Sequence, residues 1–168
     1  MHFILCGMMG AGKTTVALAL AKQTGRKCWD TDEEIVKKHG GISDIFAHFG
    51  EGYFRDLETQ MVKTLSQEQN AIISVGGGLV LRQENVEILQ KMGKIIYLRA
   101  SLDTLTERLA GDTARPLLQD DKEGLRERIS RILDARAAVY EQAADCIVDV
   151  DKKTPESIAQ EVLKKLGY

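Results

Sequence analysis

The sequence predicts an α/β fold in which helices cover both faces of a parallel sheet. Short apolar segments alternate with longer segments of helix-forming residues, and this alternation is typical of parallel strands joined by helical crossovers. A glycine-rich loop joins the first apolar segment to the first helical one, which is the arrangement that binds phosphates at a helix N-terminus. No repeat, low-complexity tract or Pro/Gly/Ser-rich linker interrupts the pattern, so residues 1–168 are expected to form one domain.

The first third of the chain gives the clearest elements. Phe3–Cys6 is a short apolar run suited to a buried strand, and Lys13–Gln23 is rich in alanine and leucine, which favour a helix. A second strand is expected at Lys27–Trp29, followed by helices at Asp32–His39 and Ser43–Phe49. The first of these two helices opens with three acidic residues, which the helix dipole favours.

The rest of the chain continues the alternation. Capping residues mark two helices: Ser101 precedes Leu102–Ala110, and Thr154 precedes Pro155–Leu166, which has proline at its first position. The other expected strands are Ala71–Val75, Lys94–Leu98 and Cys146–Val150, and the other expected helices are Glu51–Gln67, Gln83–Lys91 and Glu123–Gln142. Gly111–Lys122 is polar and irregular, so we expect a mobile surface loop over a site.

Residues 7–14, Gly-Met-Met-Gly-Ala-Gly-Lys-Thr, fit the phosphate-binding pattern G-x-x-x-x-G-K-[ST] at every fixed position. Its glycines let successive backbone N–H groups point toward phosphate oxygens, and the following helix adds its positive N-terminal end. Lys13 is suited to the β- and γ-phosphates, and the Thr14 hydroxyl is suited to Mg²⁺. The sequence therefore predicts a nucleoside triphosphate site, against the alternative of a plain glycine-rich turn.

Composition narrows the possible partners. The chain has 23 Lys and Arg against 25 Asp and Glu, and this formal net charge of -2 gives no reason to expect nucleic-acid binding. No apolar run approaches the ~20 residues of a membrane span, and the first strand leaves no room for a signal peptide. The three cysteines, Cys6, Cys28 and Cys146, are widely spaced and are expected to be buried reduced thiols. We therefore expect a cytoplasmic monomer that acts on small molecules.

Ligands of such sheets gather beyond the carboxyl ends of the strands, and two motifs follow strands there. Asp30 and Asp32 come after the second strand, and if this stretch is extended both side chains project to one face. One would then serve the metal and the other the acceptor, although an ordinary acidic helix start is the alternative. Three glycines, Gly76–Gly78, follow the third strand and suggest that a ligand or another backbone approaches closely, with a plain loop as the alternative.

Arginines supply the cations that phosphoryl transfer needs. Arg55 and Glu58 stand three residues apart in a predicted helix, where the carboxylate can orient the guanidinium or form an ordinary surface pair. Six further arginines crowd the irregular segment and its flanking helices, and most are expected on a solvated face: Arg108, Arg115, Arg126, Arg128, Arg131 and Arg136.

Taken together, these motifs resemble the shikimate kinases, P-loop kinases related to the nucleoside monophosphate kinases. The resemblance runs nearly end to end. It is carried by residues 7–15, Asp30-Thr31-Asp32, Phe49-Gly50-Glu51, Phe54 to Glu58, Gly76–Gly78, Arg115-Pro116-Leu117, Arg136, Tyr140 and Ala144-Asp145. It implies a three-layer fold with a five-stranded parallel sheet ordered 2-3-1-4-5, a substrate-binding segment near residues 31–60 and a lid near 111–122. It also implies transfer of the γ-phosphate of ATP to the 3-hydroxyl of shikimate, on the route to chorismate and the aromatic amino acids.

The resemblance also implies roles for single residues. For ATP and Mg²⁺ it implies phosphate contacts from Gly10, Ala11, Gly12, Lys13, Thr14 and Thr15, a metal site at Thr14 and Asp30, and base contacts from Arg108, Lys153 and Pro155. For the acceptor it implies Asp32 at the hydroxyls, as base or positioning group, and Arg55 and Arg136 on the carboxylate, with Gly77 and Gly78 completing the pocket. Arg115 would face the transferring phosphate, so Lys13, Asp32 and Arg115 are the implied catalytic residues.

Four other functions are compatible with a phosphate-binding loop. A gluconate kinase would share the loop but has no evident need for Arg55 and Arg136 beside three glycines. A nucleoside monophosphate kinase would need a base-reading pocket that has no signature here. A GTP-dependent switch would need N-K-x-D, which is absent. A non-catalytic relative that only binds nucleotide is disfavoured because every expected catalytic position is filled.

Overall fold

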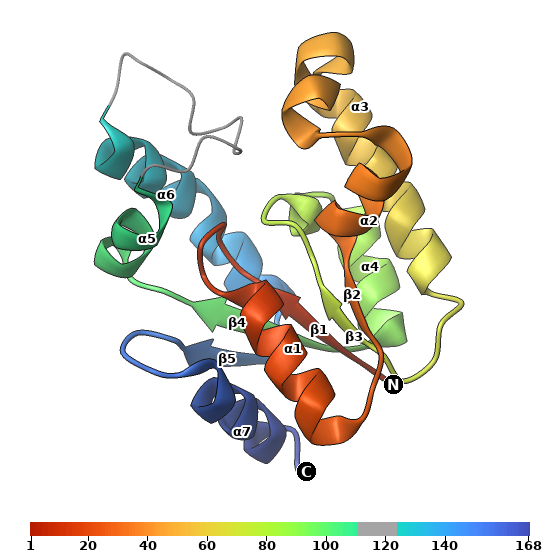
Figure 1. Ribbon diagram of the computed structural model, residues 1–168, viewed down its shortest axis with the longest axis vertical. Coiled ribbons are helices and arrows are strands. Elements are labelled where there is room, and N and C mark those ends of the chain that lie inside the picture. Colours follow the sequence, from red (N-terminus) through yellow and green to blue (C-terminus); the bar gives the residue numbers. More distant parts are fainter. Residues whose placement is uncertain (111–123) are drawn as a thin grey trace.

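A five-stranded parallel sheet runs through the centre of the protein, and its strand order is β2-β3-β1-β4-β5 (Figure 1). This computed structural model describes residues 1–110 and 124–168. The strands are β1 (His2–Cys6), β2 (Cys28–Asp30), β3 (Ile72–Ser74), β4 (Gly93–Arg99) and β5 (Cys146–Asp149). All four pairings between neighbours are parallel, which confirms both the α/β class and the expected order.

The first strand occupies the middle of the sheet because every one of its residues can be buried. Phe3, Ile4, Leu5 and Cys6 are completely inaccessible to solvent. Complete burial of an aliphatic or aromatic side chain contributes roughly 1.5–3 kcal/mol, so this strand anchors the fold. The sheet consequently presents the end of β1, and the loop after it, at the centre of its carboxyl edge.

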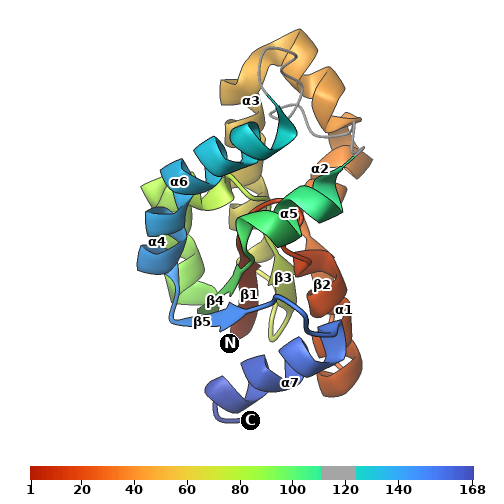
Figure 2. The same cartoon turned by 90° about the vertical axis from the view of Figure 1, so that its left-hand side faces the viewer.

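Helices form a layer on each face of the sheet (Figure 2). On one face α1 (Lys13–Thr24) packs against α7 (Pro155–Lys165), and on the other lie α3 (Ile42–Leu65), α4 (Gln83–Met92) and α6 (Leu125–Ala143). The shorter α2 (Thr31–His39) and α5 (Leu102–Leu109) follow β2 and β4 at the carboxyl edge (Figure 1). These two helices and the loop after β1 therefore surround the place where ligands of such sheets bind.

The boundaries of some elements differ from those expected. The two helices expected on either side of Gly50 form one element, α3, with a kink at Gly50, whose φ of 83° and ψ of 170° are not helical. A 3₁₀ turn, η1 (Leu79–Leu81), follows the three glycines and was not predicted. The predicted start of the helix that corresponds to α6, at Glu123, lies outside the described residues.

The cysteines are free thiols, as expected, but only Cys6 is fully buried. Cys28 and Cys146 are half-buried, so the expectation of three buried thiols was wrong for these two. Both lie on strands at the edges of the sheet, which are covered less completely than β1. None of the described helices combines the length and the apolar character that crossing a membrane requires.

His2, at the start of β1, is buried, and the hydrogen-bond partners of its ring nitrogens determine which nitrogen carries the proton. The backbone N–H of Ala71 donates to Nδ1 at 3.1 Å, so Nδ1 carries no proton and Nε2–H donates to the carbonyl of Glu68 at 3.1 Å. Burial lowers the pKa of His2, and the charges of the N-terminal amine and Arg26 lower it further. The folded protein therefore favours the neutral imidazole.

This arrangement predicts a pH dependence of stability. Since the folded pKa lies below the 6.5 of an exposed histidine, the His2 contribution is present above pH 6.5 and is lost as the pH falls below it. We expect His2→Gln, whose amide cannot titrate, to lose less unfolding free energy than the wild type between pH 7.5 and pH 5. Urea denaturation at both pH values measures this difference. His48→Gln removes an exposed histidine as the control. An identical pH dependence in the His2 variant and the wild type would contradict the argument.

Candidate active site

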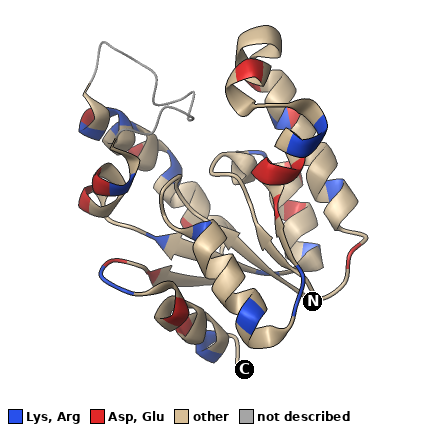
Figure 3. Cartoon of the chain, in the orientation of Figure 1, with Lys and Arg blue, Asp and Glu red and all other residues tan. Residues whose placement is uncertain are grey.

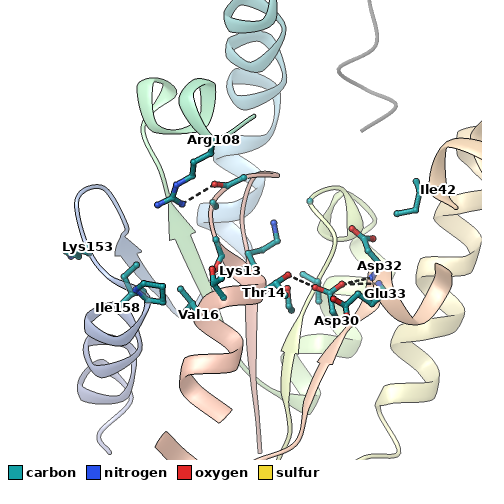
Figure 4. A pocket seen from close by; sticks show the side chains of 18 residues that line it. Lys13, Thr14, Val16, Asp30, Asp32, Glu33, Ile42, Arg108, Lys153 and Ile158 are labelled. Atoms are coloured by element: carbon teal, nitrogen blue, oxygen red, sulfur yellow. Dashed lines mark hydrogen bonds between the residues drawn. The ribbon is translucent and has the colours of Figure 1, made fainter. Parts of the chain in front are cut away.

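A cleft of about 540 Å³ opens at the carboxyl edge of the sheet (Figure 4). It lies between the loop after β1, the start of α2, the end of β3 and the start of α7. Twelve of the residues predicted for the site line it: Gly10, Ala11, Gly12, Lys13, Thr14, Thr15, Asp30, Asp32, Gly77, Arg108, Lys153 and Pro155. The fold thus brings together side chains and backbone from five separate stretches of the sequence.

The glycine-rich loop has the geometry of a phosphate cradle. Gly10 and Gly12 have φ angles of 82° and 90°, left-handed values that strain any residue with a Cβ. Gly12 at the N-cap of α1 offers no side chain that could cap the helix, and the N-terminal end of a helix is a favourable place for an anion. The Lys13 ammonium donates to the carbonyls of Gly7 and Met8, each at 2.9 Å, and is thereby held over the loop. An anion seated here would meet backbone donors, the helix dipole and one ammonium group.

Thr14 and Asp30 bring two oxygen atoms together beside this loop. The Thr14 hydroxyl donates to Asp30 Oδ2 at 2.7 Å (Figure 4). The other oxygen of Asp30 accepts the backbone N–H groups of Asp32 and Glu33 at 3.0 and 3.2 Å, so Asp30 is also the N-cap of α2. A hydroxyl and a carboxylate are hard oxygen ligands of the kind Mg²⁺ prefers. Among the described residues, no group of three His, Cys, Asp or Glu could hold a metal ion by itself.

Residues 30–32 are not extended throughout, so the condition for both aspartates to project to one face is not met, although both line the cleft. The helix begins at Thr31, so Asp30 caps it and Asp32 lies in its first turn, beside Glu33 and Glu34. Figure 3 shows these acidic residues at the start of α2 and its basic residues at the end, as the helix dipole favours. The two interpretations of this segment are therefore compatible: Asp30 and Asp32 belong to an acidic helix start, and both also line the cleft.

Charged side chains lie against all three glycines, and at Gly76 and Gly78 they lie so close that a larger residue would clash with them. A Cβ at Gly76 would lie 2.6 Å from Asp32 Oδ1 and 3.0 Å from Glu58 Oε1. A Cβ at Gly78 would overlap the Arg55 guanidinium, and one at Gly77 would lie 3.5 Å from Arg136 Nη1.

Arg55 and Arg136 consequently rest against two consecutive glycines, although α3 and α6 carry them from opposite ends of the sequence. Neither arginine lines the cleft itself, and nor does Gly78. Gly77 does line the cleft, and it is the residue that connects Arg136 to the cleft.

Carboxylates hold the Arg55 guanidinium in place. Glu58, which is 1% exposed, accepts a hydrogen bond from Arg55 Nη1 at 2.9 Å, and Glu51 accepts one from Nη2 at 3.0 Å. The Arg55–Glu58 pair is therefore an orienting pair in the interior, and the alternative of a surface pair is wrong. Glu51 is a partner that the sequence analysis missed, and its i,i+4 spacing from Arg55 on a helix was the available signal.

Burial raises the pKa of Glu58 to about 7, against the lowering effect of the Arg55 charge and hydrogen bond. The charge of Asp32 raises this pKa further, and that of Arg136 lowers it. Because the value lies above the 4.5 of an exposed glutamate, the folded state retains a proton that the unfolded chain releases. Glu58 thus lowers stability as the pH rises from 4.5 to about 7, the opposite sign to His2.

A buried threonine ties the acidic helix to the glycines. Thr31 is completely buried, and its hydroxyl accepts the backbone N–H of Gly76 at 2.9 Å. This bond joins the turn between β2 and α2 to the loop after β3, and it places Asp32 over Gly76. The sequence carries no signal for this role, since a threonine at a helix start has many local uses.

Arg108 and the start of α7 form the opposite end of the cleft (Figure 4). Arg108 Nη1 donates to the carbonyl of Gly10 at 3.1 Å, which places the guanidinium over the phosphate cradle. Lys153 pairs with Glu161 at 2.6 Å, and Pro155 occupies the first position of α7. This end of the cleft therefore offers a guanidinium on one side and the loop before α7 on the other.

The structure does not describe two of the predicted features. Arg115 and the expected lid at residues 111–122 lie outside the described residues. Of the other arginines, Arg126 pairs with Asp103 at 2.6 Å on the exposed surface, as expected for a solvated helix face.

Comparisons with known proteins identify the family of this chain. The family model for shikimate kinase matches residues 9–167. A shikimate kinase of Thermodesulfovibrio yellowstonii is 44% identical over 165 residues, which cover 98% of this chain and 94% of that protein. A shikimate kinase of Chromobacterium violaceum is 38% identical and is matched over 89% of its length, with 98% of this chain covered.

Solved structures show the same relationship. A shikimate kinase from Acinetobacter baumannii, described as a complex with shikimate, matches with a TM-score of 0.94 at 32% identity, covering 98% of this chain and 92% of that one. A deoxyadenosine kinase from M. mycoides, at 15% identity and a TM-score of 0.66, shares the fold alone. With the match to the family model and relatives at this identity over nearly the whole length, the chain belongs to the shikimate kinase family of ATP-dependent kinases.

Proposed function

We propose that this chain transfers the γ-phosphate of ATP to the 3-hydroxyl of shikimate through the residues assembled at the cleft. One observation carries the proposal. The phosphate cradle lies beside three glycines, and one aspartate and two arginines from α2, α3 and α6 lie against these glycines. Shikimate offers one carboxylate and three hydroxyls, and guanidinium groups suit the first while a carboxylate suits the second. The Acinetobacter relative, described in complex with shikimate, supports the same substrate.

On the nucleotide side, the proposal assigns the phosphates to residues 10–15, with Lys13 at the β- and γ-phosphates. The carbonyls that now hold the Lys13 ammonium place it directly over the cradle, where it would neutralise charge on the transferring group. Arg108 and the loop carrying Lys153 and Pro155 would enclose the base. Arg108 already lies over the cradle and lines the cleft together with the other two.

Mg²⁺ would be held by Thr14 and, directly or through water, by Asp30. Their oxygen atoms lie 2.7 Å apart at the cradle, and Mg²⁺ typically takes one or two protein ligands while phosphates and water complete its shell. The ion would supply charge neutralisation between the β- and γ-phosphates. The cap that Asp30 forms on α2 would keep its carboxylate in place during the reaction.

On the acceptor side, Asp32 would hold the reacting hydroxyl, as a base or as a positioning group. Arg55 and Arg136 would hold the carboxylate, with the backbone of Gly77 and Gly78 between them. The carboxylates of Glu51 and Glu58 leave Arg55 little freedom, so its orientation is set before substrate arrives. Four expectations stay predictions: a single domain, the role of Arg115 in a lid, a monomeric state and a cytoplasmic location.

The substrate assignment is tested by turnover with shikimate, gluconate and AMP, measured as ADP release. We expect ADP release with shikimate alone. Preferred turnover of gluconate or AMP would overturn the assignment, and ATP binding without turnover of any acceptor would point to a nucleotide-binding relative.

The carboxylate clamp predicts a selective loss of shikimate affinity. Arg55→Ala or Arg136→Ala should raise the KM for shikimate by roughly tens-fold and leave ATP binding intact, because each removes a charge-assisted hydrogen bond worth ~1.5–3 kcal/mol. Replacement by lysine should rescue only in part, since an ammonium lacks the two-pronged guanidinium geometry. Steady-state kinetics and ATP titration measure both effects.

Arg82→Ala is the matched control for the clamp. Arg82 also pairs with an α3 carboxylate, Asp56 at 2.7 Å, but its side chain is partly exposed, whereas Arg55 and Arg136 are buried against the glycines. Its loss should leave the KM for shikimate unchanged. The methyl ester of shikimate, which lacks the negative charge, should be a poor substrate of the wild type. Equal turnover of ester and acid, or an unchanged KM in both clamp variants, would refute the clamp.

A further inference from the structure

Tyr140 stands behind the glycines and has no role in the site described so far. It lies on α6 one turn after Arg136 and is completely buried. Its ring packs against that of Tyr97 on β4, with centroids 5.1 Å apart. A ring needs nothing more than apolar surroundings, but a buried phenol hydroxyl requires a polar partner.

The Tyr140 hydroxyl donates to the backbone carbonyl of Gly77 at 2.5 Å. Arg136 faces the same hydroxyl and opposes the effect of burial, which raises the Tyr140 pKa to about 12, so the phenol stays protonated and remains a donor. The Tyr140 hydroxyl therefore bonds to the backbone against which Arg136 rests, and the Arg136 charge acts on the same hydroxyl.

Gly77 packs against both the phosphate loop and Arg136. A Cβ there would lie 3.3 Å from the backbone nitrogen of Met9, and 3.5 Å from both the Gly7 carbonyl and Arg136 Nη1. The residue is thus held between the phosphate loop and α6. The bond from Tyr140 to the Gly77 carbonyl therefore joins α6 to a backbone segment that lies against the phosphate loop.

We infer that Tyr140 is a positioning residue for the acceptor, which holds the Gly77 backbone and the Arg136 guanidinium in register through its hydroxyl. This inference rests on the proposed role of Arg136 at the shikimate carboxylate. Tyr140 does not touch the reacting atoms, and it acts through Gly77 and Arg136. Its ring packs in the core against Tyr97, whereas its hydroxyl oxygen bonds to the Gly77 backbone at the site.

Tyr140→Phe separates the two functions because it removes only the oxygen. We expect the KM for shikimate to rise roughly 3- to 10-fold, the effect of losing one hydrogen bond, with kcat and the KM for ATP within about 2-fold of wild type. Tyr97→Phe is the matched control, since it removes a hydroxyl from the neighbouring ring, which is 2% exposed. The control should leave all three constants unchanged. Urea unfolding midpoints of both variants report any loss of stability separately.

The same substitution in an Arg136→Lys background tests whether Tyr140 acts through Arg136. The two effects on the KM for shikimate should then fall short of additive. If Tyr140→Phe leaves this KM unchanged while Arg136→Lys raises it, the positioning role is wrong and the clamp stands. If Arg136→Lys leaves the KM unchanged, the clamp has failed. Equal effects of Tyr140→Phe and Tyr97→Phe on the KM would reduce Tyr140 to a core residue and overturn the inference.

Discussion

Lys13→Ala is expected to abolish measurable phosphoryl transfer to shikimate. In this structure the Lys13 ammonium is held over the phosphate loop by two backbone carbonyls, at the place where the β- and γ-phosphates would lie. A cation there neutralises charge on the transferring phosphoryl group, and loss of a comparable cation in related phosphoryl transfers lowers kcat by about 10³–10⁵. A coupled assay of ADP release with saturating ATP and shikimate measures the effect.

Lys22→Ala is the matched control for this experiment. Lys22 lies in the last turn of the same helix, α1, and is exposed to solvent. Its removal changes the net charge of the protein equally but leaves the cradle intact, so full activity is expected. Activity close to that of the wild type in the Lys13 variant would remove the basis for assigning residues 10–15 to the triphosphate.

Asp32→Asn should lower kcat by roughly 10²–10⁴, the range typical of a lost general acid–base group, and leave ATP binding nearly unchanged. The asparagine keeps the size and a hydrogen-bonding oxygen but loses the charge that would hold or accept the proton of the hydroxyl. The position of Asp32 against Gly76, fixed by the Thr31 hydroxyl, should survive the change. Single-turnover kinetics together with ATP titration separate the chemical step from binding.

Two neighbouring variants separate the role of Asp32 from the effect of charge alone and from the effect of the metal. Glu33→Gln removes a negative charge from the same turn of α2 and should leave most of the rate. Asp30→Asn should act through the metal and appear as an altered Mg²⁺ dependence, because Asp30 accepts the bond from Thr14. If the Asp32 variant kept most of its rate, neither a basic nor a charged positioning role could be maintained.

The residues by themselves determined the parts of this protein that depend on local chemistry. The loop at residues 7–14 can be identified from residue types alone. Its positive φ angles require glycine, and a phosphate requires backbone donors next to a cation, so the glycines and the lysine appear directly in the sequence. The class of the fold followed from the alternation of apolar and helical segments. The strand order and the acceptor followed from resemblance to a family, since periodicity does not specify which strands are neighbours.

The tertiary structure alone decided how the acceptor residues meet. Arg55 and Arg136 stand on helices far apart in sequence, and only the packing of α3 and α6 around the glycines brings their guanidinium groups against Gly78 and Gly77. Contacts of this kind depend on burial and on the path of the whole chain, so no local pattern encodes them. The same holds for the Tyr140 hydroxyl, whose partner 63 residues away becomes its neighbour only when the sheet forms.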